Sequence, residues 1–101
     1  MASMKKLYEM LEDRVDSAKH FAKCAMHEKC CYPIMAKTFY DISVDDMNNA
    51  KKLQDEVERL IKSTDEEAES VQMMAVFDYM TDRMTEKMAR VREYQNLYRE
   101  G

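Results

Sequence analysis

The chain has one glycine and one proline among its 101 residues. Tight turns between strands depend on glycine, proline and a few other small residues, so a β-rich fold with many hairpins is excluded. Alanine, methionine, lysine and glutamate are frequent, and all four are good helix formers. Charged residues make up 36% of the chain and hydrophobic residues 46%, a balance typical of amphipathic helices and not of disorder. The composition therefore predicts an all-α protein.

Apolar residues recur in steps of three and four along three long stretches. This spacing predicts helices over about residues 3–29, 33–62 and 65–99. The first break precedes Pro33, which suits the first turn of a helix because its missing N–H costs nothing there. Both connections are short, so consecutive helices should run antiparallel. We expect a single helical domain over residues 1–101, folded as an antiparallel three-helix bundle.

Helices of about 27 to 35 residues are about 40 to 50 Å long at 1.5 Å per residue. Three such rods form a thin bundle with a large surface for its volume. The apolar stripes of the first and third stretches are wider than one three-helix core requires. We therefore expect a second copy to cover part of the surface, in a homodimer.

Two polar residues, Asp46 and Asn49, interrupt the apolar stripe of the second helix. The spacing places both at buried positions. They form either a binding site or a buried polar layer that fixes the register or the pairing of the helices. The two interpretations differ in what else must lie near Asp46.

Carboxylates on all three helices are candidates for that neighbourhood. Counting outward from the two turns places Asp16, Asp46 and Asp82 at one level of the bundle. Three further residues are expected near that level: His20, Asn49 and Asp78. Hard divalent cations bind several carboxylate oxygens, so a cation between the helices is one interpretation. The other is that Asp78 and Asp82 face solvent.

The stretches DSAKHFAKCA and FYDISVDDMNNAKKL resemble the helix pair of small ferritin-like proteins of the rubrerythrin type. The resemblance covers about the first 62 residues and implies a ferritin-like fold. In that family a Glu-x-x-His motif and a further Glu hold a di-iron or di-manganese centre. The carboxylate of the first helix falls on Asp16 and the motif on Asp46-Met47-Asn48-Asn49. Asp is shorter than Glu, Asn49 replaces the imidazole, and the third helix lacks a second copy, so the motif is degenerate.

The whole chain is also similar to small uncharacterised three-helix proteins of this kind carried by bacteria and their phages. This similarity brings no assigned activity. It implies only that such a chain is expected in bacteria or their phages.

Thiols near the first turn give a second candidate metal site. Cys24, His27 and Cys31 share a face if the first helix continues, and thiolate with imidazole suits zinc or copper. The alternative is a buried Cys24 beside a frayed turn, with His27 near the helix C-terminus. Overall no cofactor is expected, and if one is bound it is divalent Fe, Mn or Zn.

Charge and hydropathy exclude several classes of function. The net charge is −4 with both signs interspersed, so direct nucleic-acid binding is not expected. No apolar run approaches the roughly 20 residues of a membrane helix, and no membrane association is expected. The N-terminus lacks an apolar signal region, and an odd number of cysteines makes no disulfide framework, so we expect a cytoplasmic protein. No nucleophile has an evident base or oxyanion partner, which argues against an enzyme.

Eleven methionines are an unusual number, and many lie on the third helix. Methionine fills irregular cores, and it is also common on adaptable binding surfaces. If the stripe binds a partner, its residues are Met73, Phe77, Met80, Met84, Met88, Tyr94 and Tyr98. The leading expectation is a non-catalytic helical protein-interaction module, which, if phage-encoded, inhibits or sequesters a host factor. The alternative is a ferritin-like metal-binding or redox protein with a carboxylate site at mid-bundle.

Overall fold

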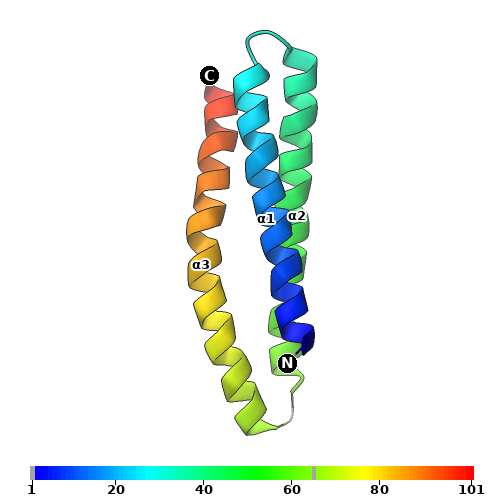
Figure 1. Ribbon diagram of the computed structural model, residues 1–101, viewed down its shortest axis with the longest axis vertical. Coiled ribbons are helices and arrows are strands. Elements are labelled where there is room, and N and C mark those ends of the chain that lie inside the picture. The colour runs from blue at the N-terminus through cyan, green and yellow to red at the C-terminus, as the bar shows by residue number, and fades with distance from the viewer. Residues whose placement is uncertain (1, 65) are drawn as a thin grey trace.

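A computed structural model describes residues 2–64 and 66–101, and these residues form three helices (Figure 1). The helices are α1 (Ala2–Glu28), α2 (Pro33–Lys62) and α3 (Glu67–Glu100). They run up, down and up along one axis, as the short connections predicted. The all-helical class is confirmed, and each predicted bound lies within two residues of the observed one. Asp65, where the third helix was predicted to begin, lies outside the described residues.

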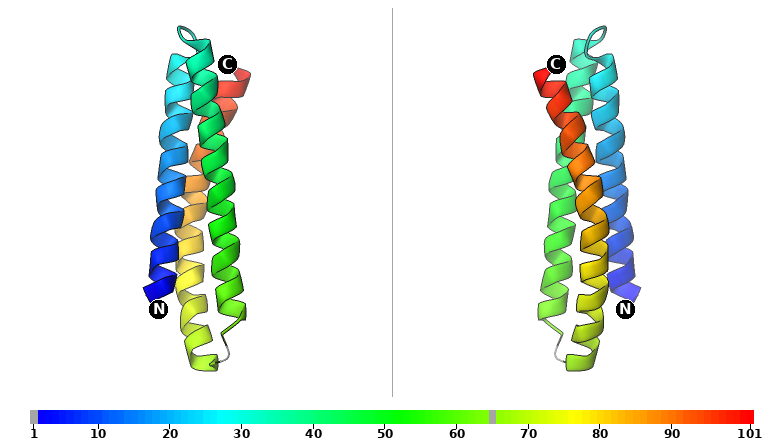
Figure 2. Two further views of the ribbon diagram at one scale, coloured as in Figure 1. Left: turned by 90° about the vertical axis from the view of Figure 1, so that its right-hand side faces the viewer. Right: turned by 90° about the vertical axis from the view of Figure 1, so that its left-hand side faces the viewer.

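The bundle is long and thin. Its Cα atoms extend over 55 × 18 × 16 Å, with a radius of gyration of 16.1 Å. A compact domain of this length has a radius of about 13 Å. In Figure 1, α3 bows away from α1 along its middle, and in Figure 2 its first half lies between α1 and α2, which diverge toward the N-terminal end of α1. Packing is most extensive between α1 and α2 and least extensive between α2 and α3.

Local chemistry explains where α1 ends and α2 begins. The Glu28 carbonyl accepts the N–H groups of Cys31 at 3.2 Å and Tyr32 at 2.8 Å, which closes the last turn of α1. Pro33 then stands at the first turn of α2 and needs no N–H partner there. The position of Pro33 therefore predicted the start of α2 correctly.

Alanines explain why α1 and α2 pack closely. Ala18, Ala22, Ala25, Ala36 and Ala50 are all fully buried. Small side chains allow two helix backbones to approach, whereas larger ones fill the core where α3 also contributes. The remaining buried hydrophobic residues are Met4, Tyr8, Leu11, Val15, Val57, Ile61, Met73, Met84, Met88 and Val91.

The level of α3 relative to α2 differs from the prediction. Gln95 donates a hydrogen bond to Ser43, and the rings of Tyr98 and Tyr40 stack with centroids 4.7 Å apart. These contacts place residue 92 of α3 level with Asp46. Asp82 is ten residues further along α3, about 15 Å away at 1.5 Å per residue. The prediction was wrong because α3 begins beyond the end of α2 along the bundle axis (Figure 1).

Candidate interaction surface

Asp46 lies inside the bundle with two partners on α1. Its side chain is only 8% exposed, and it accepts a hydrogen bond from the Ser17 hydroxyl at 2.6 Å. The Arg14 guanidinium lies 3.3 Å from its other carboxylate oxygen. A buried carboxylate requires a charge partner and hydrogen bonds. Arg14 and Ser17 supply both, so Asp46 joins α1 to α2.

A second set of buried hydrogen bonds joins all three helices. The Ser43 hydroxyl donates to the Ala18 carbonyl at 2.7 Å and accepts from the Gln95 amide at 3.0 Å. Ser43 is fully buried and Gln95 is 8% exposed. With Asp46, these side chains form a polar layer inside an otherwise apolar core. Such a layer favours one register of the helices over others.

Sequence reasoning missed Ser43 and Gln95, although a signal was present. Ala36, Ser43, Ala50 and Val57 are seven residues apart and fully buried, so the seven-residue step identifies Ser43 as a core position. Asn49 precedes Ala50 by one residue, a rotation of about 100°, and its side chain is exposed. The prediction that Asn49 occupies the buried stripe was therefore wrong.

The other carboxylates predicted to lie near Asp46 face outward. Asp16 is exposed and lies 3.0 Å from the Lys87 ammonium, which also lies 3.1 Å from Glu12. Partial burial lowers the pKa of Lys87, but the hydrogen bonds that its ammonium donates to Asp16 and Glu12 outweigh this effect, and the net shift of the pKa is upward. Three further predicted residues are exposed, and none of them forms a hydrogen bond or ion pair with Asp46: His20, Asp78 and Asp82.

Across residues 2–64 and 66–101, no group of three or more His, Cys, Asp or Glu side chains is placed to hold a metal ion. The carboxylates of Asp16 and Asp46 have separate partners, and residue 49 supplies no inward ligand. The metal site at mid-bundle remains a prediction of the sequence alone.

The predicted thiol site is likewise dispersed. Cys24 is half-buried, with its sulfur 3.8 Å from Nε2 of His20, while His27 is exposed. Cys31 lies on the exposed turn, where its sulfur is 3.1 Å from that of Cys30. That hydrogen bond between neighbouring thiols raises the pKa of Cys31.

The predicted partner-binding stripe packs into the core of the chain itself. Met73, Met84 and Met88 are buried, so they are not available to a partner in the folded monomer. Four others are half-buried: Phe77, Met80, Tyr94 and Tyr98. The regular spacing of this stripe therefore identified mainly core residues.

Four exposed hydrophobic side chains lie on the first half of α3, and together we name them the α3 apolar surface: Val71, Met74, Val76 and Tyr79. Val71 is 62% exposed and Tyr79 is 65% exposed. Val71 and Val76 are five residues apart, a rotation of about 140° around the helix. Apolar side chains on so much of a helix circumference exceed what one core can cover.

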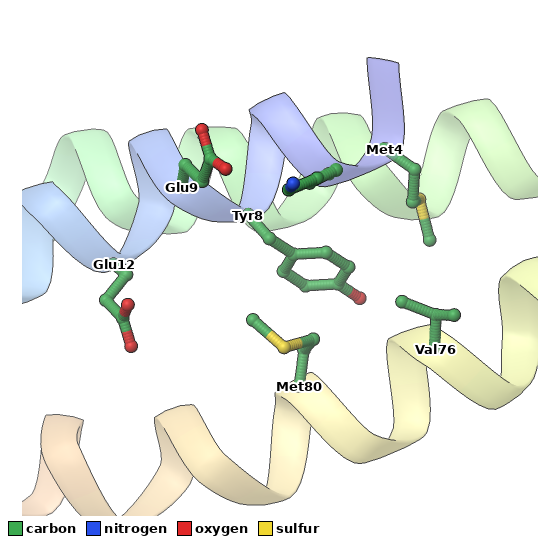
Figure 3. Close-up of a pocket in the computed structure, with 7 residues that line it drawn as sticks. Met4, Tyr8, Glu9, Glu12, Val76 and Met80 are labelled. Atoms are coloured by element: carbon green, nitrogen blue, oxygen red, sulfur yellow. The ribbon is translucent and has the colours of Figure 1, made fainter. Parts of the chain in front are cut away.

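A groove lies between α1 and α3 beside this surface, with a volume of about 350 Å³. Met4, Val76 and Met80 form apolar walls, and the ring of Tyr8 projects from α1 toward α3 (Figure 3). Lys5, Glu9 and Glu12 also line the groove. Val76 belongs to both features, so the groove and the α3 apolar surface are continuous.

Tyr8 is an unusual residue in this groove. Its side chain is 4% exposed, and its hydroxyl has no hydrogen-bond partner among the described residues. Burial raises the pKa of Tyr8, and the nearby charge of Asp78 raises it further. A tyrosine hydroxyl keeps its proton near neutral pH even without such a shift, so that of Tyr8 is a potential hydrogen-bond donor. This arrangement could not be predicted from the sequence, because Tyr8 occupies an ordinary position in the apolar stripe of α1.

Comparison with protein-family models, with curated proteins and with solved structures finds no significant match to this chain. The resemblance to ferritin-like proteins thus stays a prediction. None of the helices in the described ranges has the combination of length and hydropathy that crossing a membrane requires.

Proposed function

We propose that the chain is a non-catalytic helical interaction module that binds another protein through the α3 apolar surface. The observation that supports this proposal is the exposure of Val71, Met74, Val76 and Tyr79 on one half of one helix. Clustered exposed hydrophobic residues on a small protein mark interaction sites, whereas scattered single ones do not. Burial of this surface would provide the free energy of association.

The occupant that we propose first is a second copy of the chain. A twofold dimer brings the same patch together from both copies, and a patch on one exposed helix is suited to self-pairing. In the monomer these four side chains are exposed on the first half of α3. Pairing of two α3 helices would give Val71, Met74 and Tyr79 apolar contacts, whereas Val76 lines the groove toward α1.

Sedimentation equilibrium on three chains tests the dimer. The wild type should have the mass of two copies, and Val71→Glu should have the mass of one, because a charge would be buried in the interface. Ala89→Glu is the matched control, since residue 89 is exposed on the other half of α3. It should remain dimeric. A wild type that is monomeric at all concentrations, or a Val71→Glu chain that still dimerises, contradicts the proposal.

If the chain is phage-encoded, we propose that the same surface binds a cytoplasmic host factor and inhibits or sequesters it. Because dimerisation and host-factor binding would use the same surface, each should compete with the other. A host factor that copurifies with the wild type should then be lost from Val71→Glu, be retained by Ala89→Glu, and shift the dimer toward a mixed complex. Equal recovery with all three chains would contradict a role for this surface.

A further inference from the structure

Cys30 and Cys31 are neighbouring free thiols on the turn that joins α1 to α2. Both side chains are exposed, and their sulfur atoms lie 3.1 Å apart. The backbone of this turn is held in place, because the Glu28 carbonyl accepts the N–H groups of Cys31 and Tyr32. A reagent in solution therefore meets two sulfurs that already lie side by side.

The backbone disfavours a disulfide between these two thiols. Neighbouring residues joined by a trans peptide have Cα atoms about 3.8 Å apart, whereas the two ends of a disulfide are usually about 4.4–6.8 Å apart. The described residues contain no cis peptide bond that would change this spacing. We therefore expect Cys30 and Cys31 to remain thiols, available to a single atom that bonds to both sulfurs.

The distance between the sulfurs indicates which atom fits between them. With bonds of about 2.3 Å, a tetrahedral zinc ion holds two sulfurs about 3.8 Å apart, and a linear copper(I) ion holds them about 4.6 Å apart. Bonds of the same length that meet at a right angle hold them about 3.3 Å apart. Trivalent arsenic forms three bonds in a pyramid with angles close to a right angle, and as a soft centre it prefers sulfur. The observed 3.1 Å between Cys30 and Cys31 is nearest to that geometry.

The number and the protonation of the ligands also favour arsenic over a metal cation. No third His, Cys, Asp or Glu among the described residues completes a metal site with this pair, whereas structural zinc has four ligands. Metal cations also require thiolates, so their binding must displace protons. The hydrogen bond with Cys30 and the charge of Glu28 raise the pKa of Cys31, which favours the neutral thiol. An arsenic atom that carries one organic group needs only two further ligands and reacts with thiols.

We propose that Cys30 and Cys31 form a chelating site for trivalent arsenic that carries one organic group. The arsenical enters as its dihydroxide. Two As–O bonds and two S–H bonds break, two As–S bonds form, and each thiol proton leaves with a hydroxide as water, so no atom changes oxidation state. The site lies at the end of the bundle opposite the α3 apolar surface, so protein binding there would leave it accessible (Figure 1).

The test is titration of the reduced and desalted protein with phenylarsine oxide, an arsenical with one phenyl group, followed by mass spectrometry. The wild type should take up one phenylarsenic group per chain and lose two free thiols in the same step. Cys30→Ser and Cys31→Ser should each bind at least about a hundredfold more weakly, because the second As–S bond is intramolecular only in the wild type. Excess ethanedithiol should remove the group, because it forms a chelate of its own.

Cys24→Ser is the matched control, because Cys24 is half-buried within α1 with its sulfur beside Nε2 of His20. It should bind phenylarsine oxide as the wild type does, and all variants should show the same helix content by circular dichroism. No uptake by the wild type, or equal affinity in the wild type and Cys31→Ser, would overturn the proposal. So would loss of binding in Cys24→Ser, or a reduced wild type that reoxidises to a disulfide between Cys30 and Cys31 before the arsenical is added.

Discussion

Replacing Ser43 by alanine should destabilise the fold by more than its size suggests. Ser43→Ala removes two buried hydrogen bonds, one to the Ala18 carbonyl and one from the Gln95 amide. Each contributes about 0.5–1.5 kcal/mol, so the loss is about 1–3 kcal/mol. Alanine returns about 0.5 kcal/mol through its higher helix propensity. The expected net loss in free energy of unfolding is about 0.5–2.5 kcal/mol.

Much of this loss should come from the Gln95 amide, which Ser43→Ala leaves without its hydrogen-bond partner. A double-mutant cycle isolates this contribution. Gln95→Leu in the Ser43→Ala background removes the unpaired amide from the core. The double variant should therefore be at least as stable as Ser43→Ala alone, with a coupling energy of about 1 kcal/mol. Urea unfolding followed by circular dichroism, at one fixed protein concentration, measures all four chains.

A control variant distinguishes the loss of a buried hydroxyl from the loss of an exposed hydroxyl on the same helix. Thr38 is exposed, and its hydroxyl donates to the Ile34 carbonyl at 3.2 Å. Thr38→Ala should change the free energy of unfolding by no more than about 0.5 kcal/mol. The reasoning is refuted if Ser43→Ala is as stable as Thr38→Ala, or if the effects of Ser43→Ala and Gln95→Leu simply add.

Three further predictions follow from other contacts. Tyr8→Phe should leave the free energy of unfolding unchanged or raise it by about 1 kcal/mol, because an unpaired hydroxyl is removed. A clear loss of stability in calorimetry would show that the hydroxyl has a partner. The pKa values of Tyr8 and Lys87 are raised in the folded chain, so the unfolded chain releases these two protons at lower pH. The free energy of unfolding should therefore be constant below about pH 10 and fall above it, less steeply in Tyr8→Phe. Equal urea midpoints at pH 8 and pH 11 would contradict this prediction. Native mass spectrometry of protein purified without chelator should show a dimer without metal, whereas one or two ions per chain would favour the ferritin-like alternative.

The apolar steps of three and four predicted the first helix, and the apolar stripe of α1 is buried. A helix that packs against two neighbours buries one continuous stripe of side chains. In α1 this stripe consists of Met4, Tyr8, Leu11, Val15 and the alanines that follow, all of which are buried. Asp46 was also correctly placed inside. In α2, Asn49 was misplaced because the buried positions there follow steps of seven, and Ser43 was missed because a serine in a core position looks like a surface residue.

The candidate site was less predictable than the core. Counting residues from the turns did not predict which residues of α3 lie beside Asp46, because the count assumes that α3 begins at the height at which α2 ends. Asp82 was therefore placed near Asp46, where residue 92 stands. The α3 apolar surface was missed for another reason: a search for one stripe along α3 selects Met73 and Met84 in the core and passes over Val71 and Tyr79. The unpaired hydroxyl of Tyr8 depends on tertiary contacts that no spacing encodes.

The alanine-rich contact between α1 and α2 has a consequence for the order of events during synthesis. The two helices are consecutive, and their tight contact joins residues that leave the ribosome before α3 does. Contacts between neighbours in sequence form quickly, and domains fold as their N-terminal parts emerge. The hairpin of α1 and α2 should thus assemble first. Packing of α3 onto this hairpin would then complete the hydrogen bonds of Ser43 by adding the one from Gln95.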